Sequence, residues 1–145
     1  MATSSPRGQF DGVGQVLWAY GQHCAITRDK DFADAVYPSV ARAVDWIHQA
    51  RKRDPLHLMP STRNGDNEDI TGHVAGHNFW AFDGLDNAVA LAKATGHAAD
   101  ADADQHEYDD FHATLMQVLE RVTSKTGGYT VEDCRQLRQR RFHRR

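Results

Sequence analysis

Residues 54–80, DPLHLMPSTRNGDNEDITGHVAGHNFW, divide the chain into two halves that each carry helical sequence patterns. The stretch holds two prolines, three glycines, a run of acidic and amide side chains, and two histidines four residues apart. Long connections inside compact helical domains are usually either functional loops or disordered segments. The stretch ends with two aromatic residues, Phe79 and Trp80, which favours an ordered loop. We expect the reactive side chains of the protein to be concentrated in this loop.

Two helices are predicted before this loop. The first covers residues 12–25, and its inward face is predicted from apolar side chains that recur every three or four residues: Val13, Val16, Leu17, Tyr20 and Cys24. Small residues in the same segment indicate close packing against another helix: Gly14, Ala19, Gly21 and Ala25.

The second helix is predicted over residues 31–52. Its apolar stripe consists of Phe32, Val36, Val40, Val44 and Ile47. Pro38 is expected to bend or split the helix, because proline lacks the amide donor and clashes with the preceding turn. The basic residues 51–53 suit the negative end of the helix dipole, and the Asp54-Pro55 pair is expected to end the helix.

Two further helices are predicted after the loop. One begins at Gly76 or His77 and ends near Thr95, with Gly96 suited to a left-handed cap. Its stripe is Phe79, Phe82, Leu85, Val89 and Ala92. The other covers residues 101–122, opens with aspartates that favour the positive helix end, and directs inward Tyr108, Phe111, Leu115, Val118 and Val122. A strand is indicated only faintly, at 128–131.

These patterns predict an all-α fold of two antiparallel helical hairpins. The short turns at Thr27 and Thr95 fall on one side of the helices, and the long loop falls on the other. Both short turns follow an alanine-containing helix and carry a threonine, which suggests a repeated hairpin unit. We divide the chain into a flexible leader (1–10), a helical domain (11–129) and a basic tail (130–145), disordered or unrelated to the fold.

The composition is that of one soluble domain. A length of 145 residues fits a single domain, and no apolar run approaches the ~18 residues that span a bilayer. The first ten residues lack the apolar core of a secretory signal. Two cysteines outside any CxxC pair form no disulfide framework. We therefore expect a cytoplasmic protein that has no membrane partner.

The net charge of −3 conceals an uneven distribution. Six arginines follow Cys134 and no acidic residue does, so the rest of the chain is strongly acidic. Phosphate binding depends on clustered lysine and arginine, and we therefore expect no nucleic-acid partner for the domain. The tail could bind nucleic acid alone; an incidental, disordered C-terminus is the favoured interpretation.

Carboxylates in the loop are the first candidates for catalysis. Asp66, Glu68 and Asp69 stand beside Asn64 and Asn67. A carboxylic acid near aromatic walls can have a raised pKa and act as general acid in glycosidic cleavage. An inverting hydrolase needs a second carboxylate ~6.5–9.5 Å away, with water between. The alternative is structural, because Asn-Gly-Asp sequences are ordinary turn formers.

His73 and His77 have a spacing that can hold zinc on a helix, but Val74 occupies the position of the glutamate in HExxH. Roles as helix-end partners are favoured, and we expect no metal and no cofactor. The tryptophans and tyrosines are mostly core by their spacing: Trp18, Trp46, Trp80, Tyr20 and Tyr37. Trp80 is the exception, since it adjoins the loop and could stack against a sugar ring.

Residues 16–47, the loop segments Leu58-Met59-Pro60 and Gly65-Asp66-Asn67-Glu68, and residues 76–96 (GHNFWAFDGLDNAVALAKATG) resemble bacterial six-hairpin glycosidase-like proteins. These are relatives of glucoamylases, trehalases and glucosidases. The resemblance implies an (α/α)6 toroid with its active site among the loops that lead from outer to inner helices. It extends over about two hairpins of six, residues 11–129, and implies that the chain is a partial one.

The resemblance implies that Asp66 is the general acid, with Glu68 as the second choice. An oligosaccharide or glycoside would be bound by the surrounding residues Asn67, His73, His77, Asn78 and Trp80. The hairpin that would supply the second carboxylate is missing, so the full-length parent is expected to be an inverting hydrolase and this chain nearly inactive. Uncovered helix faces are expected to cause self-association. The alternative is a non-catalytic helical interaction or scaffold domain.

Overall fold

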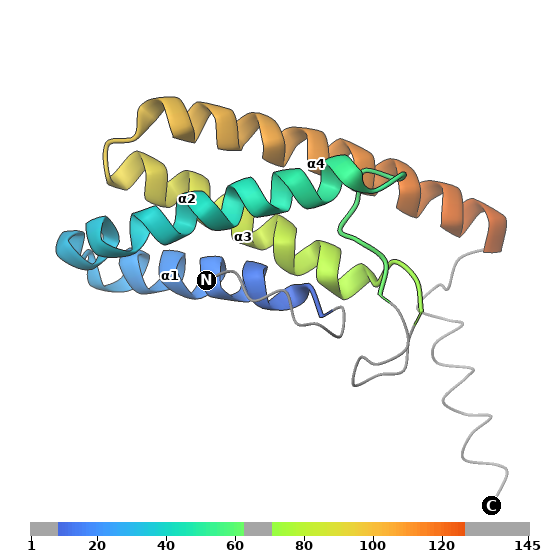
Figure 1. The fold of residues 1–145 in the computed structure, drawn as a ribbon, viewed down its shortest axis with the longest axis horizontal. Coiled ribbons are helices and arrows are strands. Elements are labelled where there is room, and N and C mark those ends of the chain that lie inside the picture. The colour runs from blue at the N-terminus through green and yellow to red at the C-terminus, as the bar shows by residue number, and fades with distance from the viewer. Residues whose placement is uncertain (1–8, 63–70, 127–145) are drawn as a thin grey trace, which may run out of the picture. The chain divides into compact units, whose positions relative to one another are not determined.

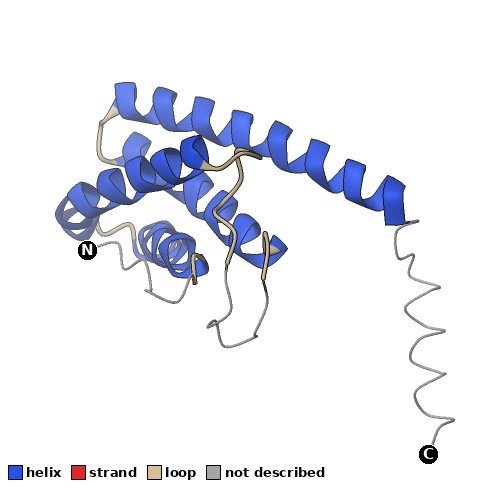
Figure 2. Cartoon of the chain, turned by 45° about the vertical axis from the view of Figure 1, so that its right-hand side comes forward, coloured by secondary structure: helices blue, strands red, loops and turns tan. Residues whose placement is uncertain are grey.

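The computed structural model describes residues 9–62 and 71–126, which form four helices (Figure 1). They are α1 (Asp11–Thr27), α2 (Lys30–Arg53), α3 (Ala75–Ala94) and α4 (Ala98–Thr126). Figure 2 shows only helices and loops in this part of the chain, apart from an isolated bridge between Thr62 and Gly72. The prediction of an all-α fold is confirmed, and each predicted helix end lies within about one turn of the observed end.

The chain forms two compact units, residues 1–115 and 116–145. The first contains α1, α2, α3 and α4 as far as Leu115. Of the second, only the end of α4 is described, and no side chain described there is buried. The leader as far as residue 8, the faint strand at 128–131 and the basic tail at 130–145 lie outside the described residues.

Glycines bring α1 and α3 into backbone contact. A Cβ added at Gly14 would lie 2.0 Å from the carbonyl oxygen of Trp80, and one at Gly84 would lie 2.8 Å from the Cα of Gly14. One added at Gly21 would lie 2.2 Å from Oδ1 of Asn87. The contacts occur in the same order along both helices, so α1 and α3 run parallel. The predicted close packing is confirmed at Gly14 and Gly21.

The inward face of α1 differs from the predicted one. Its buried residues are Gly14, Leu17 and Gly21, whereas Val16 is 48% exposed. Successive helical residues are rotated by about 100°, so Val16 points nearly opposite to Gly14. Apolar periodicity predicts that large side chains form the buried face of a helix. In α1, the close approach of the α1 and α3 backbones determines which face is buried.

Helix α2 is continuous through Pro38, so of the two expected effects of the proline, a bend or a split, the split does not occur. Tyr37 and Val40 on either side of the proline are buried, whereas Pro38 itself is exposed. Packing of the neighbouring turns therefore offsets the hydrogen bond that the proline cannot donate. The predicted end of the helix is confirmed, because α2 finishes at Arg53.

Aromatic contacts close both hairpins. The ring of Phe32 in α2 packs against Tyr20 and His23 of α1. Phe82 in α3 stacks on Tyr108 of α4 at 4.3 Å and lies edge-on to Phe111. The core between the helices contains the largest fully buried apolar side chains: Leu17, Val40, Ile47, Met59, Leu85, Leu91 and Phe111.

Polar side chains join α2 to α4. The hydroxyl of Tyr37 donates to Asp100 at 2.7 Å, and Nδ1 of His48 lies 2.6 Å from Glu107. Arg51 donates to Glu107 and to Asp110. These contacts also follow the same order along both helices, so α2 and α4 run parallel as α1 and α3 do.

The two short turns share a hydroxyl contact. Oγ1 of Thr27 donates to the carbonyl of His23, and Oγ1 of Thr95 donates to the carbonyl of Leu91. After Thr95 the predicted left-handed cap is confirmed, since Gly96 has φ +82°. The amide of His97 donates to the carbonyl of Ala92, and this hydrogen bond completes a Schellman motif.

Several residues that were predicted to lie in the core are exposed. Trp18 is 41% exposed, Phe79 is 49% exposed and Val122 is 50% exposed. Phe79 precedes Trp80, whose carbonyl lies against Gly14 of α1, and Val122 lies in the second unit. Within the described residues, no helix combines the length and the apolar character that crossing a membrane requires.

Candidate functional site

The long loop between α2 and α3 is attached to the helices at its first residue by Asp54. Its Oδ1 accepts the amides of Leu56 and Leu58 at 2.9 and 3.4 Å, and its Oδ2 lies 2.8 Å from Nε2 of His73. Asp54 is 8% exposed. The buried carboxylate of Asp54 therefore binds the start of the loop at Leu56 and Leu58, and it also contacts the end of the loop at His73.

Asn78 holds the loop a second time from the first turns of α3. Its Oδ1 accepts the amide of Met59 at 2.9 Å, and its Nδ2 donates to the carbonyl of Val74 at 2.9 Å. Asn78 is 2% exposed and Met59 is fully buried. The amide side chain thus satisfies a buried backbone donor and a backbone acceptor together, which is what a buried polar group requires.

A two-residue bridge closes the loop. The amide of Thr62 donates to Gly72 at 2.9 Å, and the amide of Gly72 donates back to Thr62 at 3.2 Å. Gly72 has φ +130°, a conformation that glycine adopts without strain. Thr62 is fully buried. The two ends of the described part of the loop are therefore held together at Thr62 and Gly72.

The structure places the predicted site residues in two groups. The two predicted catalytic residues, Asp66 and Glu68, and the neighbouring Asn67 lie outside the described residues. The other four occur at the start of α3 and just before it: His73, His77, Asn78 and Trp80. The structure therefore describes four of the seven predicted site residues and neither of the two predicted catalytic residues.

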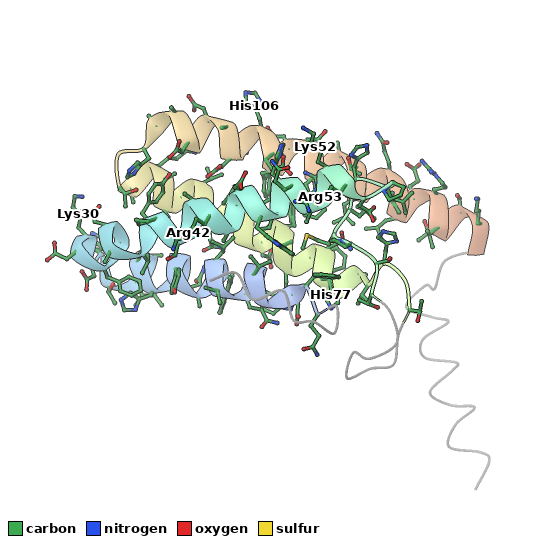
Figure 3. All side chains as sticks on the ribbon, in the orientation of Figure 1. Lys30, Arg42, Lys52, Arg53, His77 and His106 are labelled. Atoms are coloured by element: carbon green, nitrogen blue, oxygen red, sulfur yellow. The ribbon has the colours of Figure 1, made fainter. Side chains whose placement is uncertain are left out.

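The two histidines have different environments. The side chain of His73 is 26% exposed and contacts Asp54. His77 is 6% exposed and lies edge-on to the ring of Phe10 at 6.0 Å, at the start of α3 (Figure 3). In residues 9–62 and 71–126, no group of three or more His, Cys, Asp and Glu residues could hold a metal ion.

Two tryptophans meet between α1 and α3. The rings of Trp18 in α1 and Trp80 in α3 are perpendicular, with centroids 6.0 Å apart. The glycine contact at Gly14 brings the two helices close enough for this pairing. Trp18 is 41% exposed, so part of the aromatic surface faces solvent.

Two residues of the loop base, Asp54 and Asn78, have roles that the sequence patterns did not reveal. Asp54 reads as a helix stop, yet a carboxylate at the negative end of a helix is unfavourable unless a specific partner holds it. The sequence signal for this role was the position of Asp54 directly after the basic residues 51–53. Asn78 gave no comparable signal, because its partner Met59 lies 19 residues earlier in the chain.

An acidic groove separates α2 and α4. Its volume is about 660 Å³, and its lining includes Asp45, Asp100, Asp104, Glu107 and Asp110. Burial first, and then the charges of Asp100 and Glu107, raise the pKa of Asp104 to about 6. Burial and the hydrogen bond to Asp100 also raise the pKa of Tyr37. The residues that line the groove all belong to α2 and α4, and none belongs to the loop.

Comparison of the chain with protein-family models, with curated protein sequences and with solved structures finds no match in any of the three.

Proposed function

We propose that the chain is part of a six-hairpin glycoside hydrolase and that its long loop contributes to a saccharide site. The carrying observation is the doubly anchored loop base, in which Asp54 and Asn78 fix the backbone on both sides of the bridge. Binding and catalytic residues commonly lie on loops that a rigid scaffold positions.

The parallel pairing of alternate helices supports the toroidal part of the proposal. Helix α1 pairs with α3 through glycines, and α2 pairs with α4 through polar side chains. Repeated hairpins in a two-layer ring bring alternate helices together in this manner. In such a ring, α1 and α3 would belong to one layer and α2 and α4 to the other, with the long loop connecting the layers.

In this proposal Asp66 is the general acid, and Glu68 is the second candidate. Asn67 and the partly exposed His73 and Trp80 would contact the sugar. His77 and Asn78 are 6% and 2% exposed, so they would act by holding the loop. Stacking on an indole ring and a few polar contacts would give weak binding.

The isolated chain is expected to bind saccharides weakly and to hydrolyse them hardly at all. General acid and general base each contribute about 10²–10⁴-fold, so the loss of one partner removes most of the rate. The test is isothermal titration with α- and β-linked disaccharides, together with hydrolysis assays of the chain and of Asp66→Asn and Glu68→Gln. Saturable binding that weakens in Trp80→Ala supports the proposal.

Three outcomes separate the alternatives. Robust turnover that either loop substitution abolishes would show that this chain supplies both carboxylates. Binding that survives in Trp80→Ala and in both loop variants would place the saccharide elsewhere. The absence of binding to every saccharide would favour a non-catalytic interaction or scaffold domain, a role that the uncharged exposed surface of α1 also suits.

A further inference from the structure

Polar contacts cross the acidic groove between α2 and α4 at its two ends. At one end the hydroxyl of Tyr37 donates to Asp100 at 2.7 Å, and at the other end Nδ1 of His48 lies 2.6 Å from Oε2 of Glu107. Asp104 lies between these two contacts on α4. Within residues 9–62 and 71–126, its carboxylate has no hydrogen bond and no ion pair. The row of contacts that joins the two helices therefore lacks one donor at its centre.

The facing wall of α2 cannot supply that donor. Ala41 and Val44 line the groove between Tyr37 and His48, and neither has a polar side chain. Asp45, which also lines the groove, adds a second carboxylate instead of a donor. The centre of the groove thus combines an apolar wall with acidic side chains.

The negative charge of the groove is only partly balanced. Arg51 pairs with Glu107 and Asp110. Three other carboxylates that line the groove pair with no basic side chain in the described part of the chain: Asp45, Asp100 and Asp104. Burial and then the neighbouring negative charges raise the pKa of Asp104 to about 6, as expected where no positive charge offsets them. Charge complementarity therefore requires a cationic occupant.

We propose that the acidic groove binds a linear aliphatic polyamine. One ammonium group lies between Asp104 and Asp45 and supplies the missing donor, and a neighbouring ammonium group contacts Asp100. The methylene groups between them lie against Ala41 and Val44, so that burial of apolar surface adds to the charge contacts. The proposal does not depend on the saccharide site, because no residue that lines the groove belongs to the α2–α3 loop.

The spacing of the carboxylates fits such a chain. Asp45 and Asp104 are 59 positions apart, as are His48 and Glu107, so the register of the two helices places them opposite each other. Asp100 lies one turn from Asp104 on the same face of α4, about 6 Å along the helix axis. Ammonium groups joined by three or four methylene groups lie roughly 5–6 Å apart in an extended chain.

The size of the groove also fits a small ligand. Its volume of about 660 Å³ falls within the ~300–1,000 Å³ that is usual for small-molecule sites. The carboxylates are distributed along α4 instead of surrounding one point, which favours an elongated cation over a single metal ion. A triamine matches the three carboxylates that have no basic partner.

Titration calorimetry with spermidine tests the site. At low salt and about pH 7.5, where Asp104 is ionised, we expect saturable binding of one molecule per chain. Asp104→Asn should weaken binding by roughly tenfold or more, because a contact between opposite charges is lost. Asp102→Asn removes the same charge at an exposed position of α4 that does not line the groove, and should keep the parent affinity. Equal weakening in the two variants would overturn the site.

A lysine placed in the groove tests the missing donor. Ala41→Lys adds an ammonium group to the α2 wall and should abolish spermidine binding, whereas Ala35→Lys adds the same charge to an exposed position of α2 outside the groove and should not. Circular dichroism checks that the variants keep the helical fold. Binding that persists in Ala41→Lys, displacement of spermidine by equimolar magnesium chloride, or the absence of saturable binding by the parent would each contradict the proposal.

Discussion

Nε2 of His73 lies 2.8 Å from Oδ2 of Asp54, a contact between residues 19 positions apart that joins the two ends of the α2–α3 loop. The same carboxylate accepts two backbone amides. Because the side chain of Asp54 is only 6% exposed, water cannot easily replace these partners. The stability of the domain and the geometry of the loop base therefore depend on the same residue.

Replacing Asp54 with alanine should destabilise the first unit. Buried donors left without partners cost roughly 1–3 kcal/mol each, and we expect urea unfolding to show a loss of about 2–4 kcal/mol. Asp34→Ala is the control, because Asp34 forms an exposed i,i+4 pair with Lys30, worth about 0.3–0.5 kcal/mol. Similar losses in the two variants would contradict a structural role for Asp54.

Gly14→Ala should separate α1 from α3. The new methyl group would overlap the carbonyl of Trp80, and overpacking of this kind costs roughly 1–3 kcal/mol or more. Gly76→Ala adds the same methyl group to α3, where the nearest atom, in Val74, lies 4.0 Å away. We expect Gly76→Ala to be neutral or stabilising by up to about 1 kcal/mol, as thermal unfolding can measure.

Arg51→Ala should be among the most damaging single changes. The guanidinium is 3% exposed, donates to Glu107 and Asp110, and lies 4.1 Å from the centre of the Phe111 ring. The side chain of Glu107 is 13% exposed and that of Asp110 is 70% exposed, so only the pair with Glu107 is buried. Removing one partner of a buried ion pair costs about 3–5 kcal/mol. Arg53→Ala, at an exposed position two residues later, should stay within about 0.5 kcal/mol of the parent. Equal denaturation midpoints would refute this prediction.

Asp104→Asn should remove a pH dependence. The pKa of Asp104 rises from 3.8 to about 6 in the folded state, so the folded state binds the proton more tightly than the unfolded state. Stability is then highest below about pH 4 and falls as the pH rises through about 6. The variant should melt at a higher temperature than the parent above pH 6 and with less change between pH 4 and 7.

Asp102→Asn provides the matched comparison for Asp104→Asn, because Asp102 is exposed on the same helix. Its melting curve should follow that of the parent across this range. A parent whose stability rises between pH 4 and 6, with the same rise in Asp104→Asn, would show that another group controls the pH dependence.

The four helices could be predicted from the sequence because long apolar stripes and their terminating residues are local signals. The orientation of α1 could not, since Gly14 contributes no apolar side chain and its importance appears only when the backbone of Trp80 lies against it. The loop anchors were missed for a related reason. Asn78 and Met59 are brought together by tertiary structure, and no local pattern records that pairing.

The bridge between Thr62 and Gly72 also has a consequence for how such a chain can diversify. Because these residues are joined by two backbone hydrogen bonds, the number of residues between them can change without shifting the register of α2 or α3. Doubling the length of a closed loop costs only about 0.6 kcal/mol in entropy. Insertions between Thr62 and Gly72 are therefore expected to leave the helical scaffold unchanged.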